Sequence, residues 1–150
     1  MFMAVVVCPR FDANGVELFS GKIGIFPFVV KEPAKRNSKN RTTGTIETKS
    51  ILSVTKDITR ACLIEKVLPA IRSKWPASTS RSPFFIQQDN ARPHIGVNDL
   101  EFMGAAQRDG FDIKLCFQPP NNLDLNVLDL GYFKQFNLFN IKMLLQMLMH

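Results

Sequence analysis

The chain has 150 residues, a formal net charge of +6 and a hydrophobic content of 45%. This length allows one globular domain with a core of its own, and the balance of apolar and charged residues is ordinary for such a domain. The three cysteines, Cys8, Cys62 and Cys116, are widely spaced and form neither a disulfide framework nor a zinc motif. We expect them to be buried thiols in a reducing compartment.

Both ends of the chain are apolar, but neither has the features of a signal peptide or a membrane span. The N-terminal run MFMAVVVC lacks a basic region and a small-residue cleavage pattern, so we expect a strand there. The C-terminal run FNLFNIKMLLQMLMH is short and is interrupted by Lys142. We therefore expect no membrane partner and no secretion.

The first half of the chain predicts two strands, a loop and a helix. The β-branched and apolar segments 2–8 and 22–30 read as strands, and the Asn-Gly pair in DANG (12–15) predicts a hairpin. The polar segment 31–45 predicts a long loop. Apolar residues spaced by three and four predict a helix over 57–75, in which Pro69 should produce a kink.

The second half alternates strands and helices. After a linker at 76–83, FFIQQ (84–88) predicts a buried strand, and 98–110 predicts a helix with Asn98 as N-cap and Gly110 as C-terminal stop. The remaining expected elements are a strand at 111–117, a Pro- and Asn-rich loop at 118–129 and a final helix from Asp129. This order predicts an α/β fold, a mixed sheet flanked by helices, with the first strand pair antiparallel and the helix-connected strands parallel.

Much of the positive charge is concentrated in one segment. Six basic residues between positions 31 and 49 face two glutamates, so the segment carries +4 of the total +6. The six are Lys31, Lys35, Arg36, Lys39, Arg41 and Lys49. This excess suits a polyanion such as nucleic acid, although charge alone favours a solvated loop. If six phosphates were met, affinity would fall on the order of 10³-fold over a modest salt range.

Asp89 stands directly after the apolar strand FFIQQ. In open α/β sheets, sites form beyond the carboxyl ends of the strands, but an Asp at this place can equally cap the turn. Asp124 and Asp129 follow the next strand and should reach the same edge. Carboxylates from neighbouring elements can hold Mg²⁺, and a pair of such ions can assist phosphodiester displacement.

Two segments, FIQQDNARPH and FQPPNNLDLNVLDLGYF, resemble the catalytic domain of mariner-superfamily transposases, especially the plant mariner-like branch. The resemblance covers roughly residues 1 to 133, and 134–150 read as a diverged C-terminal helix. It implies a ribonuclease-H-like fold across a single domain, 1–150. It also implies that Asp89 and Asp129, with 129 − 89 − 1 = 39 residues between them, are the second and third catalytic, metal-binding acids.

The same resemblance implies divalent-metal-dependent DNA cleavage with Mg²⁺ or Mn²⁺, DNA as partner, a possible homodimer, no small-molecule substrate and a nuclear location. The run KRNSK is a weak import signal in the same direction. Arg92 and His94 of the motif are candidate DNA contacts beside Lys35, Arg36, Lys39 and Arg41. For Arg92 a solvated turn cation, and for His94 a structural role, are the alternatives.

The family's first acid lies in a motif such as DEKWF, upstream of the segment that matches MFMAVVVCPRFD, and no DExW motif occurs in this sequence. We therefore expect a truncated fold without its first, central strand. Segments 2–8 and 84–88 would then pair directly or expose their edges. Three functions follow: a transposase domain inactive by itself, a nucleic-acid-binding remnant, or another ribonuclease-H-like nuclease. A degraded reading frame without a role is the fourth possibility.

Overall fold

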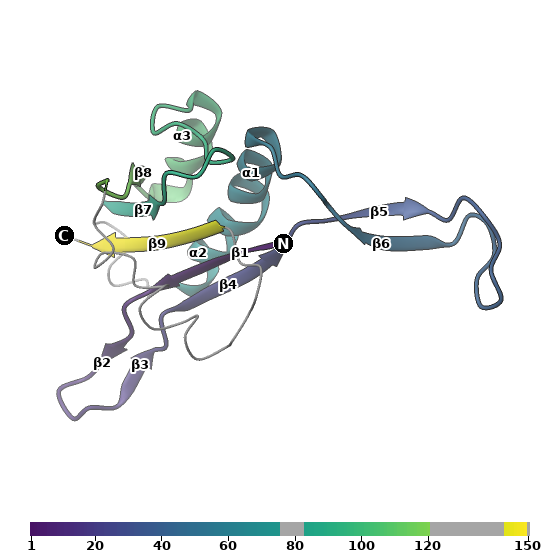
Figure 1. Ribbon diagram of the computed structural model, residues 1–150. Helices are drawn as coiled ribbons and strands as arrows, with labels where there is room; N and C mark the ends of the chain where they lie inside the picture. Colours follow the sequence, from purple (N-terminus) through teal and green to yellow (C-terminus); the bar gives the residue numbers. More distant parts are fainter. Residues whose placement is uncertain (76–82, 121–142, 150) are drawn as a thin grey trace.

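The computed structural model describes residues 1–75, 83–120 and the backbone of 143–149. A five-stranded mixed sheet forms its centre, with the strand order β4-β1-β9-β7-β8 (Figure 1). These strands are β1 (Phe2–Val7), β4 (Lys22–Pro27), β7 (Phe84–Gln88), β8 (Ile113–Phe117) and β9 (Met143–Met149). The chain is therefore of the mixed α/β class that the sequence predicts.

Two hairpins and three helical regions complete the described chain. The hairpins are β2 (Arg10–Phe11) with β3 (Glu17–Phe19), and β5 (Val29–Pro33) with β6 (Ile46–Ser50). The helical elements are α1 (Lys56–Cys62), a π-helical turn (Leu63–Val67), α2 (Leu68–Lys74), α3 (Leu100–Ala106) and a 3-10 turn (Arg108–Gly110). Among the helices of the described residues, none has the length and hydropathy of a membrane-spanning segment.

The strand directions agree with the prediction. β1 pairs with β4 in antiparallel orientation, and β7 pairs with β8 in parallel orientation through the α3 crossover. The predicted hairpin is present as β2–β3, where Asp12 Oδ1 accepts hydrogen bonds from the backbone N–H groups of Asn14 and Val16, each at 2.8 Å. The apolar residues of the strands and the Asn-Gly turn signal were sufficient to predict these elements from the sequence.

The end of the chain differs from the prediction. A helix was expected over 134–150, but Met143–Met149 form β9, which lies between β1 and β7. β9 runs parallel to β1 and antiparallel to β7. The physical reason is that β1 and β7 each have an edge of backbone N–H and C=O groups that needs a partner, and one inserted strand satisfies both edges. β1 and β7 consequently neither pair directly nor remain open.

The helical segment over residues 56–74 continues through Pro69, where the sequence predicts a kink, and it changes to a π-helical turn just before that residue. Proline has no N–H to donate, which interrupts the regular pattern of hydrogen bonds. The chain accommodates this with a wider π-helical turn immediately before it, in which the N–H of Leu68 donates to the carbonyl of Leu63. Thr55 caps the start of α1, because its side chain accepts a hydrogen bond from the Ile58 N–H.

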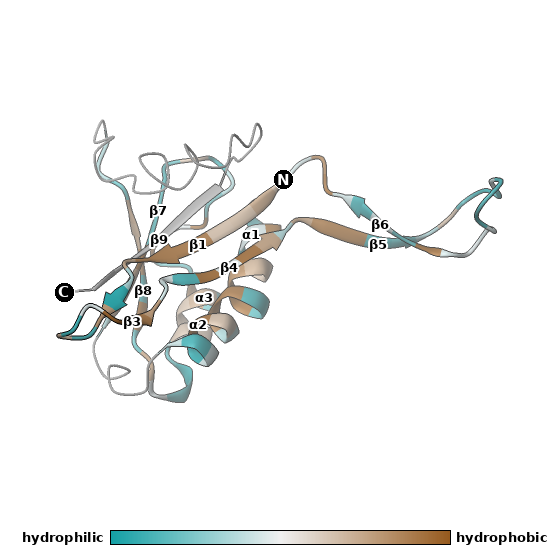
Figure 2. Ribbon diagram, turned by 90° about the horizontal axis from the view of Figure 1, so that it is seen from below, coloured by the Kyte–Doolittle hydropathy of each residue, from teal (hydrophilic) through white to brown (hydrophobic). Residues whose placement is uncertain are grey.

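The helices cover one face of the sheet and form the core with it (Figure 2). Met3, Val5 and Ile23 from the sheet and Leu63 and Ile71 from the helices are fully buried. Trp75 packs edge-on against Phe84, with ring centroids 4.6 Å apart. This packing joins the end of α2 to β7 and so fixes the strand that leads to Asp89.

Residues 29–50 form a hairpin that projects away from the body of the molecule (Figure 1). We call this hairpin the arm. The predicted loop over 31–45 was therefore partly wrong, since its first three residues, 31–33, belong to β5, which pairs with β6 directly after the loop. The tip is closed by reciprocal backbone hydrogen bonds between Ser38 and Arg41, at 2.7 and 3.1 Å. No apolar alternation marks these strands, because the arm packs on no core.

The N-cap of α3 is Asp99, one residue beyond the predicted Asn98. Asp99 Oδ1 accepts a hydrogen bond from the Phe102 N–H at 3.0 Å. The helix ends at Ala106, and the predicted stop Gly110 closes the following 3-10 turn with a positive φ of 76°. This turn leads the chain into β8.

Candidate functional site

Asp89 lies at the carboxyl end of β7, directly beside the end of β8. Two hydrogen bonds hold the segments after these strands together. The Gln118 N–H donates to the Gln88 carbonyl at 2.8 Å, and Asn90 Nδ2 donates to the Gln118 carbonyl at 3.1 Å. The ends of the two parallel strands thus lie side by side, at the edge where the sequence predicts a site.

The Asp89 carboxylate makes two contacts, and both use Oδ1. His94 Nε2 lies 2.7 Å from this oxygen, and the Ala91 N–H donates to it at 2.8 Å. Asp89 therefore does cap the turn, which is one of its two predicted roles. No described residue contacts Oδ2, and 29% of the side chain is exposed. The turn role thus leaves Oδ2 without a contact from the described residues.

The environment of Asp89 favours its ionised form. Burial raises the pKa of the carboxyl, but the hydrogen bonds from His94 and from the Ala91 N–H lower it further than burial raises it. The net effect is a pKa below the usual value for an aspartate. Asp89 is consequently a carboxylate at neutral pH, the form in which it can attract a metal ion.

His94 does not occupy the position expected for a DNA contact. Its side chain is fully buried, and it is held against Asp89 by the turn that the motif forms. Gln88 supports the same turn, since its Nε2 donates to the Ile95 carbonyl at 2.7 Å. His94 is therefore a structural partner of Asp89, because a ring without exposed surface cannot reach a phosphate.

Arg92 lies on the exposed side of the same turn. It forms no ion pair with any residue that the structure describes, so its charge, three residues from Asp89, is not neutralised within that part of the chain. Its predicted contact with phosphate and the alternative, a solvated turn cation, both fit this position.

The partner acids of Asp89 fall outside the described residues. Asp124 and Asp129 belong to the segment 121–142, so their approach to Asp89 stays a prediction. Among residues 1–75 and 83–120, no three His, Cys, Asp or Glu side chains gather closely enough to hold a metal ion. Mg²⁺ is usually held through one or two carboxylates together with substrate phosphates. Asp89 supplies a single carboxylate, so the described residues do not complete a metal site.

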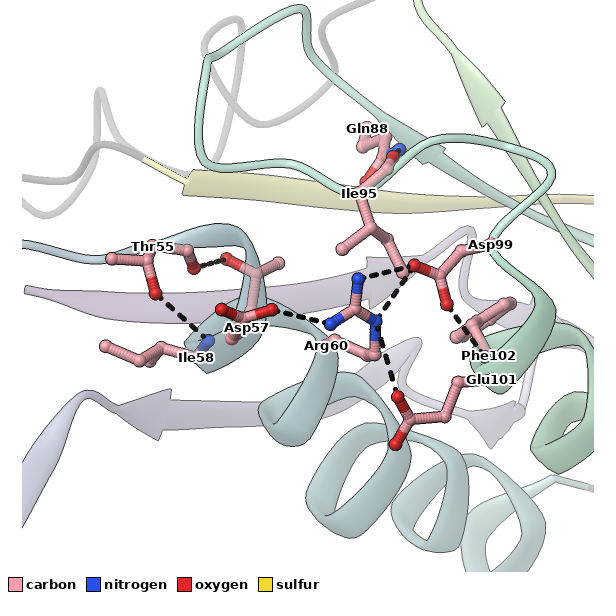
Figure 3. Close-up of polar contacts among 10 residues, drawn as sticks. Thr55, Asp57, Ile58, Arg60, Gln88, Ile95, Asp99, Glu101 and Phe102 are labelled. Atoms are coloured by element: carbon pink, nitrogen blue, oxygen red, sulfur yellow. Dashed lines mark hydrogen bonds and ion pairs between the residues drawn. The ribbon is translucent and has the colours of Figure 1, made fainter.

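An ion-pair network beneath this edge joins α1 to α3 (Figure 3). Arg60 Nε and Nη2 lie 2.9 and 2.8 Å from Asp99 Oδ2, and Arg60 Nη1 lies 2.7 Å from Asp57 Oδ1. Glu101 Oε2 is 3.7 Å from Arg60 Nε. The hydrogen bond from Arg60 is the main reason that the pKa of Asp99 lies below its usual range. The network fixes the start of α3, and thereby the loop that carries the motif.

Sequence reasoning missed this network. The spacing of Asp57 and Arg60 on one helix face would have indicated their pair. Arg60 and Asp99 are 39 positions apart, and no local pattern links them.

The basic residues of the arm divide into two groups. Arg41 pairs with Glu47, and Lys49 Nζ lies 3.4 Å from Glu32 Oε2 and 3.8 Å from Glu47 Oε2. These two cations neutralise the two glutamates. The other four are exposed and have no ion pair within the described residues. They are Lys31, Lys35, Arg36 and Lys39. The expected contact through Arg41 is thus weakened, because its charge is already engaged.

Comparisons with protein-family models, with curated proteins and with solved structures found no match to this chain.

Proposed function

We propose that this chain is the catalytic domain of a mariner-like transposase, which binds DNA but does not cleave it by itself. The observation that carries the proposal is the position of Asp89. An acid inside the motif FIQQDNARPH lies at the carboxyl end of a buried parallel strand and keeps one carboxylate oxygen clear of the described residues. This is the location where an acid that binds metal would be needed.

The sheet lends support to the ribonuclease-H-like part of the proposal. An antiparallel pair, β1 and β4, lies on one side of the central position, and a parallel pair, β7 and β8, lies on the other. The resemblance implies a first strand at that central position, between the second and the fourth. In this chain β9 occupies the position, and its sequence MLLQMLM contains no acid.

The proposed lack of cleavage follows from this substitution. Two-metal phosphodiester cleavage needs carboxylates that hold both ions around the scissile phosphate. β9 brings none to the centre of the sheet, so Asp89 and Asp129 would have to act without the third acid. Two acids can bind one divalent ion, Mg²⁺ or Mn²⁺, but they do not hold the two ions that this reaction needs. A nuclear location and a homodimer belong to the same proposal.

DNA binding is the capacity that we expect to persist. Four exposed cations on the arm and Arg92 beside Asp89 provide positive charge without bound acidic partners among the described residues. Contacts of this kind are sequence-independent and weaken with salt.

The test is an incubation of the purified chain with a labelled DNA duplex and either Mg²⁺ or Mn²⁺. We expect a protein–DNA complex and intact DNA. Cleavage that disappears in both Asp89→Asn and Asp129→Asn would refute the claim that the chain is inactive alone. Absence of any complex at low salt would refute the proposed function itself. Arg92→Gln, which removes a charge on the exposed side of the turn and none of the contacts of Asp89, should weaken the complex while leaving the fold intact.

A further inference from the structure

The two strands of the arm place their acidic side chains on one face only. In an antiparallel ladder, directly paired residues share a face and successive pairs alternate between faces. Glu32 pairs with Glu47, so both acids lie on one face, together with Lys49. Lys31 pairs with Thr48 on the opposite face, where no strand residue is acidic. One face of the ribbon is therefore internally neutralised, and the other is acid-free.

The tip adds three cations to this arrangement. Lys35, Arg36 and Lys39 lie in the turn region between β5 and β6, and all three are exposed. Figure 2 shows the end of the arm as largely hydrophilic, far from the helices and the sheet. A polyanion could approach the tip and the acid-free face together without meeting a carboxylate of the arm.

The tip is folded before any partner arrives. Asn37 Oδ1 accepts hydrogen bonds from the Thr43 N–H at 2.5 Å and from the Thr43 hydroxyl at 2.8 Å. Ala34 and Gly44 are also joined, since the Gly44 N–H donates to the Ala34 carbonyl at 2.9 Å. Binding then does not require the loop to be ordered first, which removes one of the usual costs of association.

The composition of the arm distinguishes between kinds of nucleic acid. Residues 29–50 contain no Phe, Tyr or Trp. Proteins that hold single strands combine positive charge with aromatic side chains on which bases stack, and the arm lacks those side chains. A two-stranded ribbon with cations and hydroxyls is instead suited to the major groove of B-form DNA, which is about 12 Å wide, with the phosphates on either side.

We propose that the arm enters the major groove of duplex DNA and contacts the phosphate backbone through Lys31, Lys35, Arg36 and Lys39. This inference rests on the proposed function and adds the substrate form and the contact surface. Recognition by these contacts is independent of base sequence, because they meet phosphates and not base edges. Lys49 and Arg41 take no part, since each is held by a glutamate of the arm itself.

Four phosphate contacts predict a definite salt dependence. The four arm contacts should contribute a slope of about −3.6 to the fall of the logarithm of the binding constant with the logarithm of salt concentration, which is about a 150-fold loss between 50 and 200 mM. In the triple variant Lys35→Gln, Arg36→Gln, Lys39→Gln one arm contact remains, and the contribution of the arm to the slope should flatten to about −0.9. These three side chains have no ion pairs within the described residues, so the fold should not change.

A second triple variant provides the matched control. Lys22, Lys56 and Lys66 are also exposed and without ion pairs in the described part of the chain, but they lie outside the arm. Changing these three to Gln removes the same net charge. The experiment compares the full chain and both variants by fluorescence anisotropy on a duplex DNA, a single strand of equal length and a duplex RNA, each across a salt series.

We expect the full chain to prefer duplex DNA over both other probes, and only the arm variant to lose the preference and the steep slope. Equal losses in both variants would overturn the arm as the contact surface, while leaving DNA binding in place. Preference for the single strand, or equal affinity for duplex RNA, whose major groove is too narrow for a ribbon, would overturn groove entry. If the unaltered chain bound none of the probes, the proposed function would fall as well.

Discussion

Asp99 performs two separable tasks, and a pair of substitutions can separate them. Oδ1 caps α3 through the Phe102 N–H at 3.0 Å, while Oδ2 receives Arg60 at 2.8 and 2.9 Å. Asp99→Ala removes both tasks. Asp99→Asn retains the cap, because Asn and Asp are equally good at this position, and removes only the charge.

The cap alone is worth about 1 kcal/mol, which for a chain of this length corresponds to a fall in Tm of about 2–4 °C. We therefore expect the Tm of Asp99→Ala to be lower than that of the unaltered chain by at least this amount. The Tm of Asp99→Asn should lie between those of the alanine variant and the unaltered chain. The gap between Asn and the unaltered chain reports the pair with Arg60, and it should shrink when salt is added, because part of that guanidinium is exposed.

Thermal and urea unfolding, followed by circular dichroism at low and high salt, would measure these differences. Arg60→Gln is the matched control for the ion pair, since it leaves the Asp99 cap in place. Equal destabilisation by Asn and Ala would refute the reasoning, because it would mean that the cap contributes nothing. A gap that does not respond to salt would refute the assignment of that gap to the ion pair.

Three further predictions concern the sheet, a turn and acid. Truncation before β9 should expose the edges of β1 and β7, and we expect the shortened chain to aggregate where the full chain stays dispersed, as light scattering would show. Gly21 has a φ of +74°, and a Cβ there would overlap the Val7 carbonyl. Gly21→Ala should therefore cost clearly more in urea unfolding than Gly15→Ala, where φ is +80° in open space and the cost is about 1 kcal/mol. The pKa values of Asp89 and Asp99 are lowered in the folded chain, so the stability they contribute is present above the unfolded value near ~3.9 and is lost as the pH falls through the lower folded values. Urea midpoints should thus decline below about pH 4, with a shallower decline in Asp99→Asn, and a midpoint that does not change down to pH 3 would contradict this.

Local sequence patterns were sufficient to predict those elements whose apolar residues pack into the core or whose turn residues fix a hairpin. The apolar strands β1, β4 and β7, the β2–β3 turn and the helix over residues 56–74 all follow from periodicity and turn residues. The apolar run MLLQMLM has no such period, so helix and strand could not be distinguished from sequence, and the open position between β1 and β7 decided the outcome. The strands of the arm were not predicted because both of their faces meet solvent, so their sequence shows no alternation of apolar and polar residues.

The sequence predicted where Asp89 lies in the fold, but it did not predict which side chains surround it. Asp89 follows an apolar strand, and that order alone indicates the edge where it lies. Burial of His94 and its contact with Asp89 Oδ1 depend on how the turn folds back onto the sheet. The pairing of Lys49 with the arm glutamates arises from strand register, and that of Arg41 with Glu47 from the way the tip folds. These pairs reduce the expected phosphate contacts on the arm from six to four.

The central claim, DNA binding without cleavage, is tested most directly on one gel. The unaltered chain is mixed with supercoiled plasmid and Mn²⁺, and half of each sample is freed of protein before it is loaded. We predict slower migration in the untreated half and intact supercoiled plasmid in the treated half. Nicked or linear plasmid that no longer forms with Asp89→Asn would contradict the account.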